Sequence, residues 1–549
     1  MEIAGESELS LRQHGSPVVL SFALLCCSPR HAVAQFRSYD SLPRITSITL
    51  VTNSIFDRND SSLLARIGNL IHVSTRPAFI RREFLFRLGD RYDSARVAET
   101  GRNLRALGVF RGVAIDTTQS DSGVDVHVVT RDAFTSQIQP TLRTSGGSSA
   151  YGLTLLETNF LGTLSQLEAG YRHDPDRSTY VLGFSRRRLI NDKIGGTVEL
   201  FDRSDGKLAF AQLLQPYFEA ASRVSGTLTF DDRRDRILQY RDGVLVPEAI
   251  VQNRYVLGRV DYGRALSASP HGYLRIGGAI QARRDDYISD SEYTARGFGT
   301  SSVTGAAGVY VDASRVNEPK VFAFASLGRD EDVDLSTNVH LALFAAPAAF
   351  GYRPGHSGVA PGISLHTGTL FPGGFVYIDA SATGLYSSIG LDSGQVFLGG
   401  TAVLMPARRH QLLLHGEASA LQNPLPGTEF DLGLGAGPRA FAQHSFTGDR
   451  EYFGTAEYRY TAGLNVFKLL DVGFATFVDR GGAWWAGDPH RSGWDYGIGL
   501  RLGFSRAPDV GTNRIDFAWR AAHDGIPGGW AFAVGKGFAF SSGLRGTAR

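Results

Sequence analysis

The chain from about residue 134 to residue 540 consists of short segments in which apolar and polar residues alternate. Residues 496–504 read YGIGLRLGF, with an apolar side chain at every second position and glycine or arginine between them. The same alternation recurs in 274–283, 411–418 and 514–520. Successive side chains of a strand point to opposite faces, so each segment predicts a strand with one apolar and one polar face.

So many alternating strands, with no helical pattern between them, predict a mainly β transmembrane protein rather than a soluble sandwich. In a transmembrane antiparallel β-barrel the apolar faces meet lipid and the polar faces line a watery interior. At about 25 residues for a strand and its connection, segment 133–540 gives about 16 strands, an even number as in bacterial barrels.

The composition supports a barrel and excludes a helical membrane protein. Only 42% of the 549 residues are hydrophobic and the mean hydropathy is −0.11, which is too low for a helical membrane protein. The 20 tyrosines and 34 phenylalanines suit the aromatic girdles of a barrel. A net charge of +2 gives no argument for nucleic acid as a partner.

The N-terminus predicts export. An apolar run at 17–27 precedes AVAQ at 32–35, a small-x-small cleavage site, so residues 1–34 are expected to be a signal peptide and 35–43 a short linker. The segment before the run is rich in glutamate, which leaves open a start codon further along. Cys26 and Cys27 lie in the leader, so the mature chain would hold no thiolate. Acylation of one cysteine is the alternative, although the preceding leucine is not the usual small residue.

Residues 44–132 carry a different pattern. A β-branched strand at 45–51 is followed by apolar residues at helical spacing, and the region closes with two strands joined by a turn at 120–123. The expected helices occupy 60–73, Thr75 to Gly89, and Asp93 to Gly108. Gly89 and Gly108 stand where a helix must end and the chain must turn.

Two segments of this region, IRREFLFRLGDRYD at 80–93 and LRALGVFRGV at 104–113, resemble the POTRA domain of the BamA/TamA outer-membrane superfamily. The resemblance implies one small α+β domain in the periplasm, where relatives carry several, with the stretch 60–73 as an addition. It also implies that an edge of its sheet receives unfolded or secreted polypeptides by strand addition. The alternative is that the domain only plugs or orients the barrel.

Residues 433–441, GLGAGPRAF, resemble the sixth extracellular loop of the same superfamily, which folds back into the lumen with an Arg-Gly-aromatic tip. Gly437, Arg439 and Phe441 keep their places, whereas Ala440 replaces the glycine. The resemblance implies that Arg439 pairs with an acidic residue of the barrel wall, Asp479 first and Glu457 second. A shielded guanidinium favours such carboxylate pairing. Otherwise, Arg439 is a solvated loop arginine.

Residues 535–540, GKGFAF, resemble the outer-membrane insertion signal, carried by Gly535, Phe538 and Phe540 and followed by a tail at 541–549. Lys536 shares strand parity with Phe538. A lysine at the bilayer midplane costs ~2–4 kcal/mol, so Lys536 is expected near an interface or at the junction of the first and last strands.

Other chemistry-bearing groups are interpreted as surface features. Asp330 to Asp334 space three aspartates like the start of a calcium loop but lack its glycine and distal glutamate. This stretch and a second acidic cluster, Asp285, Asp286, Asp290 and Glu292, are expected to be solvated extracellular loops. GHSG at 355–358 is not a nucleophile elbow, and the histidines are scattered. We therefore expect no enzyme, no cofactor and no metal.

Together the patterns predict a bacterial outer-membrane barrel with its N-terminal domain in the periplasm. The resemblance implies insertion, assembly or translocation of polypeptides, with membrane lipid, polypeptide clients and periplasmic or lipoprotein partners. A passive pore or surface antigen that kept only the fold is the alternative. A barrel lipid hydrolase using Ser357 is the second alternative.

Overall fold

The computed structural model describes residues 42–537 apart from 57–61, 64–65, 67–68, 70–71, 146–147, 242, 247–250, 289–300, 351–355, 389, 425–426, 435, 507–510 and 523–524. The expected signal peptide, most of the linker, the tail at 541–549, and Phe538 and Phe540 lie outside the described residues. So does much of the expected helix at 60–73.

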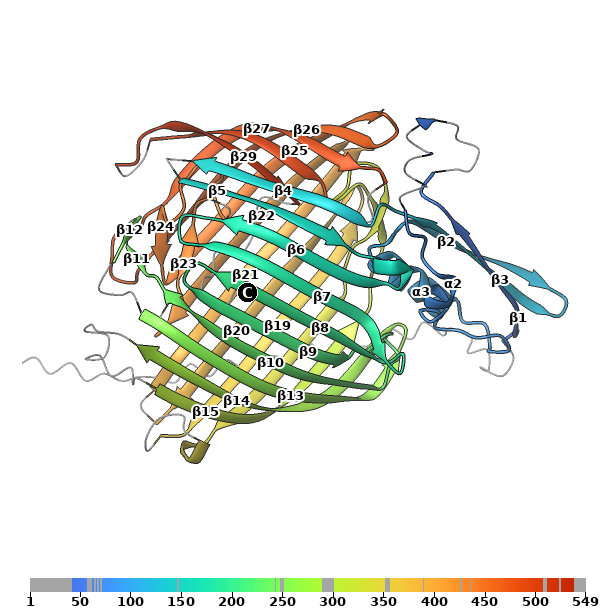
Figure 1. The fold of residues 1–549 in the computed structure, drawn as a ribbon, viewed down its shortest axis with the longest axis horizontal. Helices are drawn as coiled ribbons and strands as arrows, with labels where there is room; N and C mark the ends of the chain where they lie inside the picture. The colour runs from blue at the N-terminus through green and yellow to red at the C-terminus, as the bar shows by residue number, and fades with distance from the viewer. Residues whose placement is uncertain are drawn as a thin grey trace, which may run out of the picture.

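Twenty antiparallel strands close into one barrel (Figure 1). In chain order they are β4 (Ser136–Ser145), β5 (Ser148–Glu157), β6 (Ser165–His173), β7 (Ser178–Ile190), β8 (Ile194–Arg203), β9 (Gly206–Gln215), β10 (Val224–Ile237), β13 (Val251–Ser269), β14 (Gly272–Ile288), β15 (Ser301–Arg315), β18 (Thr337–Ala346), β19 (Gly358–Phe371), β20 (Gly374–Ser387), β21 (Gly390–Ala407), β22 (His410–Gln422), β25 (Arg450–Val466), β26 (Leu470–Trp484), β27 (Gly493–Phe504), β28 (Asn513–Arg520) and β29 (Gly529–Lys536). Short 3₁₀ turns lie at Phe160–Gly162 and Ala348–Phe350.

The expected barrel is confirmed, but the expected count of about 16 strands is wrong. The cause is the length of the connections. Several neighbouring strands are joined by only two residues, as between Ser269 and Gly272 or between Phe371 and Gly374. Such hairpins shorten the average repeat, so more strands fit into the same chain.

The strand alternation separates an apolar outside from a charged inside. On β27, Ile498 faces outward and is 66% exposed, whereas Arg501 faces the lumen and is 1% exposed. Leu182 on β7 and Ile280 on β14 are likewise 57% and 62% exposed on the outer wall. An apolar belt of this kind is the surface that a transmembrane barrel presents to lipid.

The first and last strands close the barrel by the shortest pairing between any two of its described strands. β29 pairs with β4 only from Phe532–Thr144 to Val534–Leu142. Lys536, at the end of β29, is exposed and its Nζ lies 3.5 Å from the Oε1 of Gln137 on β4. The lysine therefore lies at the junction of the two strands, as expected from the cost of placing a lysine in the bilayer.

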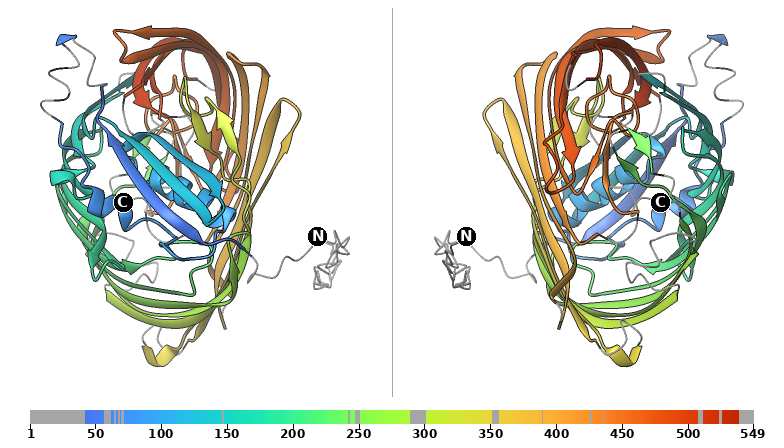
Figure 2. Two further views of the ribbon diagram at one scale, coloured as in Figure 1. Left: turned by 90° about the vertical axis from the view of Figure 1, so that its right-hand side faces the viewer. Right: turned by 90° about the vertical axis from the view of Figure 1, so that its left-hand side faces the viewer.

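The N-terminal domain is a three-stranded sheet with helices packed against it at one end of the barrel (Figure 2). Its elements are β1 (Ile45–Asn53), α2 (Pro77–Arg81), α3 (Ser94–Ala106), β2 (Phe110–Ser120) and β3 (Gly123–Asp132), with sheet order β1-β3-β2. Residues Ile80, Val97, Leu104 and Val126 are buried in its core. We call the barrel end that carries this domain the domain end, and the opposite end the far end.

The helices of this domain differ partly from expectation. α3 begins after Asp93, whose side chain accepts hydrogen bonds from the backbone of Ala95 and Arg96, and the turn after it places Gly108 at a φ of 62°. The helix expected from Thr75 to Gly89 is wrong beyond Arg81. There the backbone N–H of Leu85 donates to the hydroxyl of Thr100 instead of continuing the helix. Among the described residues, no helix is long and apolar enough to cross a membrane.

Candidate functional site

Two segments between barrel strands fold into the lumen from opposite ends. The loop insert, residues 423–449 between β22 and β25, enters from the far end and carries β23 (Phe430–Leu432) and β24 (Phe446–Gly448). The hairpin insert, residues 316–336 between β15 and β18, enters from the domain end and carries β16 (Lys320–Phe322) and β17 (Asp330–Asp332).

The loop insert places Arg439 among carboxylates of the barrel wall. Its Nη2 lies 2.8 Å from the Oε2 of Glu457 on β25, and its Nε lies 2.9 Å from the Oδ2 of Asp479 on β26. Its Nη1 lies 3.5 Å from the Oδ2 of Asp516 on β28. The guanidinium also lies over the ring of Phe477, 3.6 Å from its centroid. The structure thus brings together Arg439 and both acidic residues named from the sequence, and adds Asp516.

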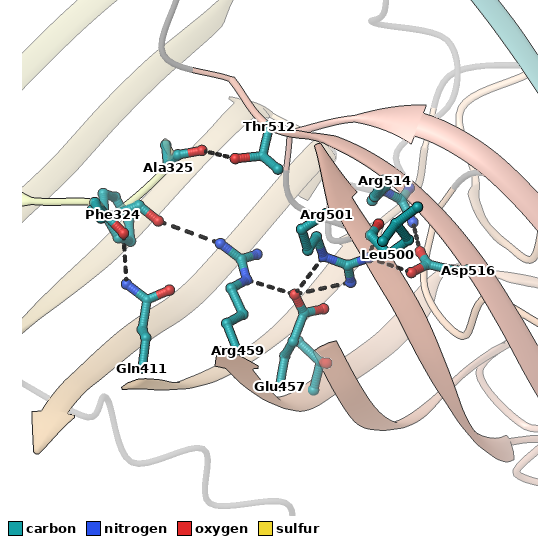
Figure 3. A network of polar contacts seen from close by, with 12 residues as sticks. Phe324, Ala325, Gln411, Glu457, Arg459, Leu500, Arg501, Thr512, Arg514 and Asp516 are labelled. Atoms are coloured by element: carbon teal, nitrogen blue, oxygen red, sulfur yellow. Dashed lines mark hydrogen bonds and ion pairs between the residues drawn. The ribbon is translucent and has the colours of Figure 1, made fainter. Parts of the chain in front are cut away.

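The ion pairs continue along the inner wall toward the domain end (Figure 3). Glu457 accepts from Arg459 at 2.6 Å and lies 3.0 Å from Arg501, while Asp516 lies 2.6 Å from Arg501 and from Arg514. All of these side chains are nearly inaccessible to solvent. Arg501, Arg514 and Asp516 were not named as site residues from the sequence. Their positions on the polar faces of β27 and β28 are the sequence signal that could have identified them.

The backbone of the insert tip is also held by the wall. The N–H of Ala440 donates to Asp495 at 2.8 Å, and its carbonyl accepts from Arg520 at 3.2 Å. Ala440 has no positive φ, so this tip does not need the glycine that the superfamily motif carries there; Gly437, with a φ of 75°, makes the turn instead. Phe441 is fully buried against Phe446. Its ring fills the space beside Gly493 on β27, where an added Cβ atom would clash with the ring.

His444 ties the loop insert to the connections at the far end. Its Nδ1 lies 2.7 Å from Asp431, and its Nε2 lies 3.0 Å from Asp176 in the connection between β6 and β7. Its ring stacks on Tyr240 in the connection between β10 and β13, at a centroid distance of 3.4 Å. Burial lowers the pKa of His444, but the bonds to Asp176 and Asp431 outweigh burial and raise the pKa above its ordinary value.

The hairpin insert corrects the interpretation of residues 330–334 as an extracellular loop. These residues lie at the domain end, and Glu331 is buried with its carboxylate accepting from the backbone N–H groups of Ala325 and Ser326. The apolar side of the hairpin, including Val321 and Leu335, packs on the lumen-facing residues Phe375, Val403 and Leu413. A lumen wall is normally polar, so these three residues form a dedicated seat for the hairpin.

The tip of the hairpin insert meets the ion-pair network (Figure 3). The carbonyl of Phe324 accepts from Arg459 at 3.3 Å, and that of Ala325 accepts from the backbone N–H of Thr512 at 3.1 Å. The two inserts therefore contact the same network, since Arg459 and Arg439 share Glu457.

The N-terminal domain holds the hairpin insert and the rim of the barrel. Arg105 of α3 makes a two-pronged ion pair with Asp332, at 2.6 and 2.9 Å, and Arg102 lies 2.5 Å from Glu318. Glu99 accepts from the backbone N–H of Ala220 at 2.5 Å in the connection between β9 and β10. Burial raises the pKa of Glu99, and the hydrogen bond from Ala220 offsets only part of that effect.

The inserts leave part of the lumen open. A cavity of about 1010 Å³ lies beside the loop insert, lined by charged residues of the early strands such as Arg143, Arg203, Asp231 and Arg233. The interior is therefore a polar chamber obstructed from both ends rather than a clear channel.

The remaining sequence candidates do not form a catalytic or metal site in the described part of the chain. The Nδ1 of His356 lies 2.7 Å from the hydroxyl of Ser388, and Ser357 accepts from the backbone of Ala348, so they engage separate partners. Asp285 and Asp286 lie on β14, not in a loop, paired with Arg283 and Arg284. Among described residues, no three or more His, Cys, Asp or Glu side chains are grouped to hold a metal ion. Asp290 and Glu292 lie outside the described residues.

Comparisons with known proteins show only distant likenesses. No protein-family model matches the chain, and no curated protein matches it. Similar solved structures include BamA from Haemophilus ducreyi lacking POTRA domains 1–3, which is 13% identical with a TM-score of 0.36 over 90% of this chain and 85% of that chain. CdiB from Acinetobacter baumannii is 11% identical, with a TM-score of 0.45 over 90% and 74% of the two chains. CdiB from Escherichia coli is 12% identical, with a TM-score of 0.44 over 89% and 76%. Likenesses this distant carry no functional conclusion.

Proposed function

We propose that this protein inserts, assembles or translocates polypeptides at a bacterial outer membrane. In this proposal residues 1–34 are a signal peptide, residues 44–132 are a periplasmic POTRA-like domain whose sheet edge takes client strands, and residues 133–540 are the barrel. The observation that carries the proposal is the loop insert, which is fixed inside the lumen by Arg439 and its three wall carboxylates.

A loop insert fixed inside the lumen argues against a passive pore. A pore conducts through a clear lumen, whereas here two inserts meet on one ion-pair network and the N-terminal domain grips one of them. Ion pairs and hydrogen bonds can be exchanged for similar contacts with a passing chain at little net cost, because the interior offers many charged partners. The apolar seat of the hairpin insert favours a closed resting state.

The test is depletion of the protein in its host, followed by quantification of the other outer-membrane and secreted proteins. We expect a defined subset to fall, and to recover with the wild-type gene but not with Arg439→Ala. Arg480→Ala, which changes an exposed arginine on the outer side of β26, is the matched control and should restore the subset fully. Unchanged levels of all these proteins after depletion would favour the passive pore or surface antigen.

A further inference from the structure

The short helix α2 lies along the rim of the barrel at its domain end. At its start, the backbone N–H of Arg76 donates to the carbonyl of Gly162 at 3.1 Å, in the turn between β5 and β6. At its end, Arg82 lies 2.8 Å from Asp192, in the turn between β7 and β8. The helix therefore spans two neighbouring connections of the barrel.

The helix lies toward the lipid side of the rim rather than toward the lumen. Arg186 pairs with Gly196 on β8, which lies two residues along the strand from the outward-facing Val198, so Arg186 also points outward. Its guanidinium lies 5.2 Å from the centre of the Phe79 ring of α2. Leu189 occupies the outer space left by Gly196, next to the outward-facing Leu213.

This part of the rim combines exposed apolar and cationic side chains. Phe160, Leu161 and Leu189 are 40%, 55% and 42% exposed and lie at or beside the domain-end ends of strands β5 to β7. Three cations, Arg76, Arg81 and Lys193, are exposed and have no carboxylate partner in the part of the chain that the structure describes. The nearby carboxylates are already engaged, since Asp192 pairs with Arg82, and Glu83 is buried against Arg188. We call these six residues the rim patch: Phe160, Leu161, Leu189, Arg76, Arg81 and Lys193.

We propose that the rim patch binds the anionic headgroups of the phospholipid leaflet around the domain end, and so anchors the N-terminal domain to the membrane surface. Apolar side chains at the edge of the belt enter the acyl boundary, while cations beside them reach phosphate at the headgroup level. The charge is complementary, because the patch is cationic and a bilayer leaflet with phosphatidylglycerol is anionic. The inference requires that the barrel lies in a membrane and is independent of its clients.

The test is amide hydrogen exchange of the full chain in nanodiscs. Discs of phosphatidylcholine alone are compared with discs that also contain phosphatidylglycerol, and the reporters are the amides of residues 78–82 and 160–163. We expect slower exchange in the anionic discs, by about fivefold for each cation engaged, and loss of the difference at high salt. Arg76→Gln with Arg81→Gln should reduce the difference to that of Lys193 alone, and Arg76→Lys with Arg81→Lys should keep it in full.

The matched control changes two arginines of the same domain away from the rim. Arg44 and Arg91 lie beside the turn between β2 and β3, which projects away from the barrel (Figure 1). Arg44→Gln with Arg91→Gln should leave the lipid dependence intact. Equal exchange in both discs, or an undiminished difference in the Arg76→Gln with Arg81→Gln variant, would overturn the proposal. Protection by soluble glycerol phosphate in phosphatidylcholine discs would overturn it in favour of a phosphate site.

Discussion

At the residue scale, the interior of the barrel depends on buried charges that satisfy one another. Arg439 reaches from the loop insert to carboxylates on three wall strands. These carboxylates are buried, so water cannot replace Arg439 as their partner. Removing one member of a buried ion pair leaves its partners uncompensated, which costs more than the pair itself stabilises.

Arg439→Ala is therefore expected to lower the free energy of unfolding by ~3–5 kcal/mol. Arg439→Lys should recover only part of this loss, because an ammonium cannot reach Glu457, Asp479 and Asp516 with the planar fork of a guanidinium. Denaturant unfolding in detergent measures both. Arg480→Ala, with its side chain exposed on the outside, should change stability by less than about 0.5 kcal/mol. Equal stability of the Arg439→Ala and Arg480→Ala variants would contradict the role given to Arg439.

His444 predicts a pH dependence of the far-end contacts. Its folded pKa is raised, so the stability it contributes is complete below the ordinary value of about 6.5 and is lost as pH rises through the folded pKa. The groups facing it are Asp176, Asp431 and the stacked Tyr240. As the pH rises from below about 6.5 through the folded pKa of His444, the melting temperature should fall in the wild type and fall less in His444→Gln. His271→Gln, in an exposed turn at the domain end, should keep the wild-type slope; an identical slope in His444→Gln would show that another group titrates.

At the element scale, the hairpin insert lies on an apolar surface of the wall, whereas the loop insert combines the ion pairs of Arg439 with an apolar cluster of its own. Phe375, Val403 and Leu413 are fully covered by the hairpin, and exposing them to a watery lumen would cost the free energy of hydrating apolar surface. The hairpin is therefore expected to leave its seat only as a unit.

Val321→Asp should unseat the hairpin insert, because it places an unpaired carboxylate in the apolar seat. The measurement is limited trypsin digestion, with cleavage after Arg329 at the hairpin tip as the readout. Lys320→Asp changes the exposed neighbouring residue and should leave that bond protected. Protection of Arg329 in the Val321→Asp variant would mean that the seat does not hold the hairpin.

The alternation of apolar residues located the strands well, since each side chain faces either lipid or lumen. It could not locate the hairpin insert, because the alternation within a segment does not show whether the segment lies in the wall or packs on the wall from inside. A clue existed at residues 412–414, three consecutive leucines that make both faces of β22 apolar. Leu412 and Leu414 fit the expected lipid face, but Leu413 lies under the hairpin. The strand count failed for a related reason, because short turns such as 270–271 leave little trace in the hydrophobic pattern.

The candidate site was predictable to the extent that it lies on regular strands or in a recognisable motif. Arg439, Glu457 and Asp479 were named from the sequence, and the structure places them in contact. Asp516 and Arg501 were not named, since an inward charge on a strand is common and only the folded barrel brings strands β25 to β28 around one point. The partners of Arg105 and Arg102 could not be predicted from the sequence either, because they lie more than two hundred residues further along the chain.

At the scale of the whole molecule, two inserts obstruct the lumen from opposite ends and contact one shared set of ion pairs. The loop insert enters from the far end, the hairpin insert from the domain end, and α3 of the N-terminal domain grips the hairpin (Figures 1 and 2). A continuous series of contacts therefore runs from α3 through the hairpin insert, Arg459 and Glu457 to Arg439 in the lumen.

The most direct test of this obstructed lumen is the ionic current through single molecules of the purified protein in a planar lipid bilayer. Wild-type protein should insert and show a small conductance with rare, brief openings. Arg439→Ala should open far more often and to a larger conductance, while Arg480→Ala should behave as wild type. A large, steady wild-type conductance that Arg439→Ala does not change would contradict the account.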